Sequence, residues 1–298
     1  MLFKIVFWCV FFLSGLTGSV YAAPNVVVST APLHSIVSAV ADGVFEPELL
    51  LAPAVSVHDF QLKPSDMRKL SGADVVFWGG PDLETGLVKA LRAAGKEESA
   101  VPVMSDPRMT LYRTRGEGRH HGIDGHFWLM PENMAVVAEI AAEKLAESDS
   151  ENAETYRRNA GRVRQMTSEL KAFGMQMLKK HKNKPYVTFH DAYQYFEKSF
   201  ELPAVGFLAA DPHHAGGAAG MAGIREKIKK SGTVCVFSEP QFPDKKVKAA
   251  AEGLAVVAGQ ADPVGSSVAA GKDFYKNLMT DLFRSFDACF QQLTEESK

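Results

Sequence analysis

The segment from Glu151 to His181 constrains the fold most, because its composition predicts one uninterrupted helix in the middle of the chain. It is rich in Glu, Arg, Lys, Gln, Leu and Met, it contains no proline, and its only glycines are Gly161 and Gly174. Residues of this kind favour helix, and at 1.5 Å per residue the segment would be on the order of 45 Å long. We therefore expect a rigid helical connector, over residues 151–182, between two separate lobes.

Short apolar segments alternate with helical patterns on both sides of this connector. Buried parallel strands are short and apolar throughout, so the pattern predicts a mainly parallel sheet flanked by helices in each half. In the first half, strands are predicted at Val26–Ser29, Phe45–Leu51, Asp74–Trp78 and Ala100–Met104. In the second half, they are predicted at Tyr186–Phe189, Leu202–Phe207, Val234–Ser238 and Ala255–Val257. The expected fold class is α/β, with four-stranded lobes at residues 23–150 and 183–298.

Residues 1–22 have the pattern of a signal peptide for export. Lys4 supplies a positive charge, Ile5–Leu13 forms an apolar core, and Val20-Tyr21-Ala22 resembles a cleavage site. A transmembrane anchor is the alternative, but small and polar residues at 14–19 interrupt the run before it reaches the ~20 apolar residues of a span. Cys9 lies too early to become a lipid-modified first residue. We expect cleavage after Ala22 and a periplasmic protein that is not lipid-anchored.

Removal of the signal would leave Cys235 and Cys289 as the only cysteines. Two cysteines in an oxidising compartment usually pair. Closing a loop of this length would stabilise the fold by roughly 4 kcal/mol. Two buried free thiols are the alternative, because a sequence does not show whether the two side chains are close.

The overall charge gives little reason to expect a strongly charged partner. The chain has a formal net charge of −2 with histidine neutral, and loss of Lys4 with the signal would change it to −3. A nearly neutral protein offers no electrostatic argument for binding nucleic acid or an acidic membrane surface. We expect neither.

Three of the nine histidines lie at junctions between apolar runs and helical segments. His190 follows a predicted strand, His58 follows an apolar run, and His126 precedes a helix that begins with proline. In α/β proteins the carboxyl ends of parallel strands open onto the crevice where ligands bind. These three residues, distant in sequence, therefore predict one shared metal site.

Three imidazoles suit a tetrahedral Zn²⁺ ion and leave one coordination position open. Asp262, after the last predicted strand, is one candidate for that position, and water is the other. Manganese sites favour carboxylates, so the set argues for a metal such as zinc, although copper and nickel would also bind imidazoles.

The other histidines have weaker claims to a metal. His120 and His121 lie in a Gly- and Arg-rich segment, which we interpret either as a loop that captures metal weakly or as a solvated loop. A second pair, His213 and His214, lies in a Gly- and Ala-rich segment that we interpret as a surface loop rather than an auxiliary site. Structural roles are expected for the last two histidines, His34 and His181.

Six segments carry a resemblance to a known family: STAPLHSIVSAV, HDFQLKPSD, DGHFWLMPEN, FHDAYQYFEKSF, CVFSEPQF and DPVG. They resemble the solute-binding proteins of bacterial zinc ABC importers, the ZnuA-like members of the cluster A-I family. The resemblance runs from Val26 to about Phe290, and it implies a C-clamp with zinc held between two lobes. The ligands and the disulfide that it implies are His58, His126, His190 and Cys235–Cys289.

Histidine at position 190 distinguishes the chain from the manganese and iron members of the family, which have a carboxylate at the matching position. Two departures concern the other ligands. Val57 stands where some zinc members have a glutamate proposed as a fourth ligand, and Gly125 replaces a common proline. The family's His-rich loop is also short here, which weakens a capture role for His120 and His121.

The resemblance implies a monomeric binding protein without enzymatic activity, which captures Zn²⁺ in the periplasm and delivers it to an inner-membrane ABC permease. A zinc-dependent hydrolase is one alternative, because three histidines and an open position also describe catalytic zinc. No HExxH motif supports it. A manganese- or iron-binding relative, or an adhesin-type relative, is the other alternative.

Overall fold

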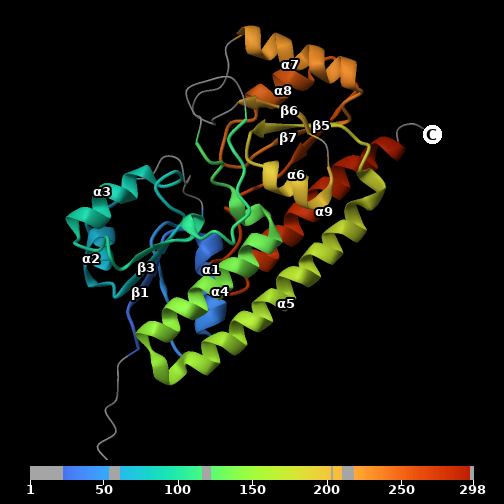
Figure 1. The fold of residues 1–298 in the computed structure, drawn as a ribbon. Coiled ribbons are helices and arrows are strands. Elements are labelled where there is room, and N and C mark those ends of the chain that lie inside the picture. The colour runs from blue at the N-terminus through green and yellow to red at the C-terminus, as the bar shows by residue number, and fades with distance from the viewer. Residues whose placement is uncertain (1–22, 54–60, 116–121, 203, 210–217, 296–298) are drawn as a thin grey trace, which may run out of the picture.

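Two four-stranded sheets organise the computed structural model, which describes residues 23–53, 61–115, 122–202, 204–209 and 218–295. All the strand pairs within each sheet are parallel, and each sheet forms the centre of one lobe (Figure 1). A long helix joins the lobes, so the predicted fold class is confirmed. Within the described residues, no helix is long and apolar enough to cross a membrane.

The N-terminal lobe has the strand order β2-β1-β3-β4. Its strands are β1 (Val26–Val28), β2 (Glu48–Leu49), β3 (Val75–Trp78) and β4 (Ala100–Pro102). Its helices are α1 (Ala31–Ala41), α2 (Pro64–Gly72), α3 (Thr85–Ala93) and α4 (Pro131–Ser148), with short 3₁₀ turns η1 (Val103–Ser105) and η2 (Phe127–Leu129). Alternate strand residues pack on opposite faces: α2 and α3 cover one face, while α1 and α4 cover the other.

The C-terminal lobe repeats this plan with the strand order β6-β5-β7-β8. Its strands are β5 (Tyr186–His190), β6 (Ala204–Ala209), β7 (Cys235–Ser238) and β8 (Val257–Gln260). Its helices are α6 (Gln194–Phe200), α7 (Ala218–Ser231), α8 (Lys245–Ala251) and α9 (Phe274–Glu295). Helices α7 and α8 cover one face, and a cluster rich in phenylalanine from α6 and α9 covers the other.

The connector is the helix α5 (Ala153–Leu178), with the 3₁₀ turns η3 (Ser150–Asn152) and η4 (Lys179–His181) at its two ends. A second helix that the sequence did not single out also spans the lobes, because α9 packs beside α5 (Figure 1). The start of α9 is anchored on α1: Ser35 Oγ donates to Lys272 O over 2.9 Å and accepts from Tyr275 N over 3.0 Å. The lobes are therefore held by two adjacent helices rather than by one.

The disulfide between Cys235 and Cys289 is present and fixes α9 to strand β7. The pairing predicted from the two cysteines is confirmed, with a Cα–Cα distance of 6.2 Å.

Four strand predictions were wrong by two or more residues at a boundary, and all four concern edge strands. Strand β4 ends at Pro102 rather than Met104, and β6 occupies Ala204–Ala209 rather than Leu202–Phe207. The strand expected at Phe45–Leu51 is only Glu48–Leu49, because Pro47 has no N–H to donate to a ladder. The strand expected at Ala255–Val257 instead occupies Val257–Gln260, after a turn in which Val256 N donates to Leu254 O. Edge strands are less buried, so an apolar run marks their ends poorly.

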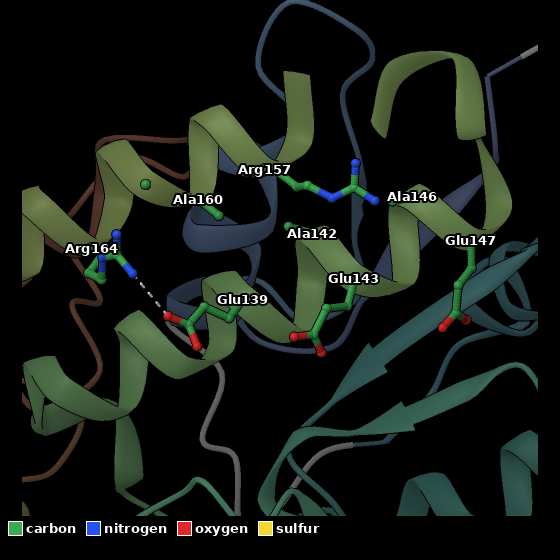
Figure 2. Close-up of a pocket in the computed structure, with 9 residues that line it drawn as sticks. Glu139, Ala142, Glu143, Ala146, Glu147, Arg157, Ala160 and Arg164 are labelled. Atoms are coloured by element: carbon green, nitrogen blue, oxygen red, sulfur yellow. Dashed lines mark ion pairs between the residues drawn. The ribbon is translucent and has the colours of Figure 1, made fainter. Parts of the chain in front are cut away.

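Figure 2 shows a groove of about 490 Å³ between α4 and α5. Small residues such as Ala142 and Ala160 line it, glutamates of α4 form one wall, and arginines of α5 form the other. Arg164 reaches across to Glu139, with a nitrogen–oxygen distance of 3.6 Å. Among the residues that the structure describes, no histidine lines this groove, which sets it apart from His126 and His190.

Candidate metal centre

His126 and His190 meet between the two lobes. His190 is the last residue of β5, at the carboxyl edge of its sheet, and His126 immediately precedes the turn η2 of the other lobe. Their Nε2 atoms are 3.4 Å apart, and each residue is only 4% exposed. The structure thus brings together two of the three histidines that the sequence predicts as ligands.

Asp124 orients the imidazole of His126. Its Oδ1 accepts from the backbone N of His126 over 3.0 Å and lies 2.8 Å from Nδ1 of the same residue, while its Oδ2 accepts from Gln194 Nε2 over 3.1 Å. Burial acts to raise the pKa of Asp124, but hydrogen bonding and the proximity of His126 outweigh burial, so the pKa is lowered. Because Gln194 belongs to α6, this carboxylate also links the two lobes.

Glu239 plays the same part for His190. It follows strand β7, next to β5 in the sheet, and its Oε1 lies 2.7 Å from Nδ1 of His190. Glu239 is only 2% exposed, and its second oxygen, Oε2, has no hydrogen-bond partner among the described residues. The ring of Phe242 packs edge-on against His190, with centroids 6.2 Å apart. The carboxylate of Glu239 and the ring of Phe242 are thus two of the groups that hold this imidazole.

Aromatic residues after His126 close the site from the side. Trp128 is fully buried, with its ring centroid 5.3 Å from that of His126. Its Nε1 donates across the lobe interface to Pro263 O over 2.8 Å. This apolar wall strengthens electrostatic interactions at the imidazole of His126.

Asp262, the predicted fourth ligand, has its carboxylate turned into its own loop. It accepts from the backbone N of Val264, Gly265 and Ser266 over 3.1, 2.9 and 2.6 Å, and from Gln241 Nε2 over 2.5 Å. Across the described ranges, no three His, Cys, Asp or Glu side chains form a group that could hold a metal. Asp262 as a ligand therefore stays a prediction, with water as its alternative.

His58, the third predicted ligand, lies outside the described residues, as do the four histidines His120, His121, His213 and His214. The two histidines expected to be structural make internal contacts. His34 Nε2 donates to Pro47 O over 2.9 Å, and burial lowers the pKa of His34. His181 Nε2 lies 2.7 Å from Asp287 Oδ1 and joins the end of the connector to α9.

A partly buried ion-pair cluster joins the lobes beside the imidazoles. Arg115, from the N-terminal lobe, contacts Asp191, the residue after His190, and its Nη1 lies 2.6 Å from Glu197 Oε2. Burial raises the pKa of both Asp191 and Glu197 despite the opposing guanidinium charge. The same carboxylates hold the pKa of Arg115 above its ordinary value, although burial acts to lower it. The cluster therefore links Arg115 in the N-terminal lobe to Asp191, which is next to the predicted ligand His190.

The sequence argument missed three of these residues: Asp124, Glu239 and Arg115. Glu239 follows a predicted strand directly, so the strand-end argument that selected His190 would also have selected it. Asp124 lies two residues before His126, where a carboxylate can reach the imidazole. Nothing in the local sequence marks Arg115, whose partners are 76 and 82 residues away.

A model of one protein family matches residues 26–289, and its description is "Zinc-uptake complex component A periplasmic". The chain belongs to this family. The "High-affinity zinc uptake system protein ZnuA" of Brucella suis is 36% identical over 322 residues, covering 94% of this chain and 96% of its own. The protein of the same name from Yersinia pestis is 31% identical over 293 residues, covering 91% and 92%.

The fold also matches solved structures. A crystal structure of ZnuA superposes with a TM-score of 0.77 at 20% identity, and it covers 90% of this chain and 99% of that one. The family is one of periplasmic solute-binding transport proteins rather than of enzymes.

Proposed function

We propose that this protein captures Zn²⁺ between its lobes in the periplasm and delivers it to an inner-membrane ABC permease. The observation that carries the proposal is the convergence of the two Nε2 atoms, from His126 in one lobe and His190 in the other, 3.4 Å apart. Two imidazoles from separate lobes allow one ion to bridge the interface, and the family relatives are named for zinc uptake. The proposed ligands are His58, His126 and His190, with Asp262 or water in the fourth position.

The proposed protein acts by ligand exchange and has no chemical step of its own. Protonated imidazole cannot bind a metal, so zinc affinity should fall as the pH is lowered. We also propose that residues 1–22 are removed on export, and that the mature chain is a monomer without a lipid anchor. The family match and the zinc-uptake names of the relatives favour this proposal over a zinc hydrolase and over a manganese, iron or adhesin-type relative.

Competition titration of each variant against a chromophoric zinc chelator tests the site. Replacing His58, His126 or His190 by Ala should weaken zinc binding by at least about 100-fold, or roughly 2.7 kcal/mol, because each change removes one metal–nitrogen bond. His181→Ala is the matched control, since His181 contacts Asp287 at the far end of the connector. Its affinity should stay within about twofold of the wild type. Unchanged affinity in all three ligand variants would refute the site, and a preference for Mn²⁺ in the wild type would refute the zinc assignment.

A further inference from the structure

Each imidazole at the interface is backed by one buried carboxylate, and the two lobes use the same arrangement. Asp124 Oδ1 is 2.8 Å from Nδ1 of His126, and Glu239 Oε1 is 2.7 Å from Nδ1 of His190. A carboxylate only accepts hydrogen bonds, so the single N–H of each neutral imidazole must lie on Nδ1. Both Nε2 lone pairs then face the same space, where the nitrogens are 3.4 Å apart.

The charges of these carboxylates match a divalent ion. Neutral imidazole ligands bring no charge, and carboxylates behind them can offset the charge of a bound dication. Asp124 and Glu239 are 3% and 2% exposed, and together they carry two negative charges at this position. On the basis of the proposed function, we propose that Asp124 and Glu239 are positioning residues that fix both imidazoles with Nε2 toward Zn²⁺ and neutralise its charge.

The two carboxylates are not equivalent, and the difference gives the proposal its sharpest consequence. Asp124 has Gln194 Nε2 on its second oxygen, whereas Glu239 Oε2 has no hydrogen-bond partner among the described residues. A buried charge with few partners destabilises the free protein, and a nearby cation offsets that cost. Glu239 should therefore contribute more to zinc affinity than Asp124 does. It should also lower the stability of the metal-free protein.

The test compares Glu239→Gln and Asp124→Asn with the control Glu226→Gln, a glutamate in the same lobe whose side chain is 56% exposed. Competition titration should give zinc binding about 10- to 100-fold weaker for Glu239→Gln, with a smaller loss for Asp124→Asn and no change for the control. Calorimetry of the metal-stripped proteins should give a thermal unfolding midpoint for Glu239→Gln that is at or above that of the wild type. A purely structural role would instead lower that midpoint.

Nitrogen-15 NMR of the histidines provides a second, independent readout. In metal-stripped wild type, His126 and His190 should carry their proton on Nδ1, and in Glu239→Gln His190 should become a mixture of tautomers. A proton on Nε2 in the wild type would overturn the proposal. So would zinc affinity within twofold of wild type in Glu239→Gln, or a lower midpoint in the metal-stripped variant. If the wild type itself does not bind zinc, the proposed function fails; if His190→Ala loses zinc while Glu239→Gln retains it, only the present inference fails.

Discussion

Each lobe contributes one half of the metal site, an imidazole with a buried carboxylate, but the two lobes hold the carboxylate in different ways. We call each such pair a half-site. Each lobe places one imidazole near the carboxyl edge of a parallel sheet and holds its Nδ1 with a buried carboxylate, from Asp124 in one lobe and Glu239 in the other. In the N-terminal lobe the carboxylate lies two residues from its imidazole, within a single turn. In the C-terminal lobe it comes from the residue after the neighbouring strand β7, 49 residues along the chain. The second arrangement depends on the pairing and packing of the sheet. Substitutions that weaken the packing of a lobe should therefore disturb the C-terminal half-site more than the N-terminal one.

The largest difference between the lobes should appear when the disulfide is removed. Cys235–Cys289 closes a loop with a sequence separation of 54 and joins the strand before Glu239 to α9, whereas no disulfide involves the described residues of the N-terminal lobe. The double variant Cys235→Ala, Cys289→Ala should lose about 4 kcal/mol of unfolding free energy in the chain-entropy model. Urea unfolding checks the value, and hydrogen exchange should show the loss in β5 and β7 rather than in β1 and β3. A loss below about 1 kcal/mol would mean that packing of α9, not the covalent link, holds this half-site.

The N-terminal lobe contains a buried acid whose ionisation is costly. Glu84 is fully buried, and burial raises its pKa to about 7 from an ordinary 4.5, against the opposing amides of Gly79 and Gly80. The folded protein therefore binds this proton more tightly than the unfolded chain does. The resulting stability is fully present below pH 4.5 and is lost as the pH rises through about 7.

Replacing this acid by its neutral analogue should remove the pH dependence. Glu84→Gln should be as stable as the wild type near pH 4, and more stable by about 3 kcal/mol at pH 8. Urea unfolding across this range checks the difference, with Glu98→Gln as an exposed control in the same lobe. A difference that stays constant with pH would show that Glu84 does not titrate in this range.

The fold could be predicted from the sequence because buried parallel strands are apolar along their whole length. Strand β3, whose four residues are all buried, was predicted over residues that include its full extent. The edge strands β2 and β8 were placed less well, since partial exposure removes that signal. Helix α9 was not singled out, although its contacts with α1 make it a second bridge between the lobes.

Site residues could be predicted only where their position in the local sequence marks them as ligands. His190 and His126 stand at junctions that parallel sheets turn toward a crevice, so their positions were predictable. The hydrogen bonds from the loop to the carboxylate of Asp262 could not be predicted, because they depend on the conformation of residues 262–266. Contacts between lobes, such as that of Arg115 with Glu197, depend on how two independent sheets are set against each other.

Two arginines allow the interface between the lobes to be compared with the surface of one lobe. Arg115 bridges Asp191 and Glu197, whose side chains are only 5% and 10% exposed, across the lobe interface. Arg108 contacts three carboxylates within its own lobe, those of Asp106, Glu139 and Glu143, and the last of them is 60% exposed. The number of charged partners is similar, but only the first pair of carboxylates is shielded from water.

Removing each arginine should therefore have unequal effects. Arg115→Gln leaves two buried carboxylates without their cation and should cost about 2 kcal/mol, less than for a fully buried pair because Arg115 is itself partly exposed. Arg108→Gln should cost less than about 1 kcal/mol, because water solvates the charges that it leaves behind. Urea unfolding measures both costs. If the Arg115 cluster restrains the angle between the lobes, small-angle X-ray scattering should detect a larger radius of gyration for Arg115→Gln but not for Arg108→Gln. Equal costs with unchanged scattering would mean that α5 and α9 set the lobe arrangement without help from Arg115, so the two imidazoles would be brought together by the helical bridge alone.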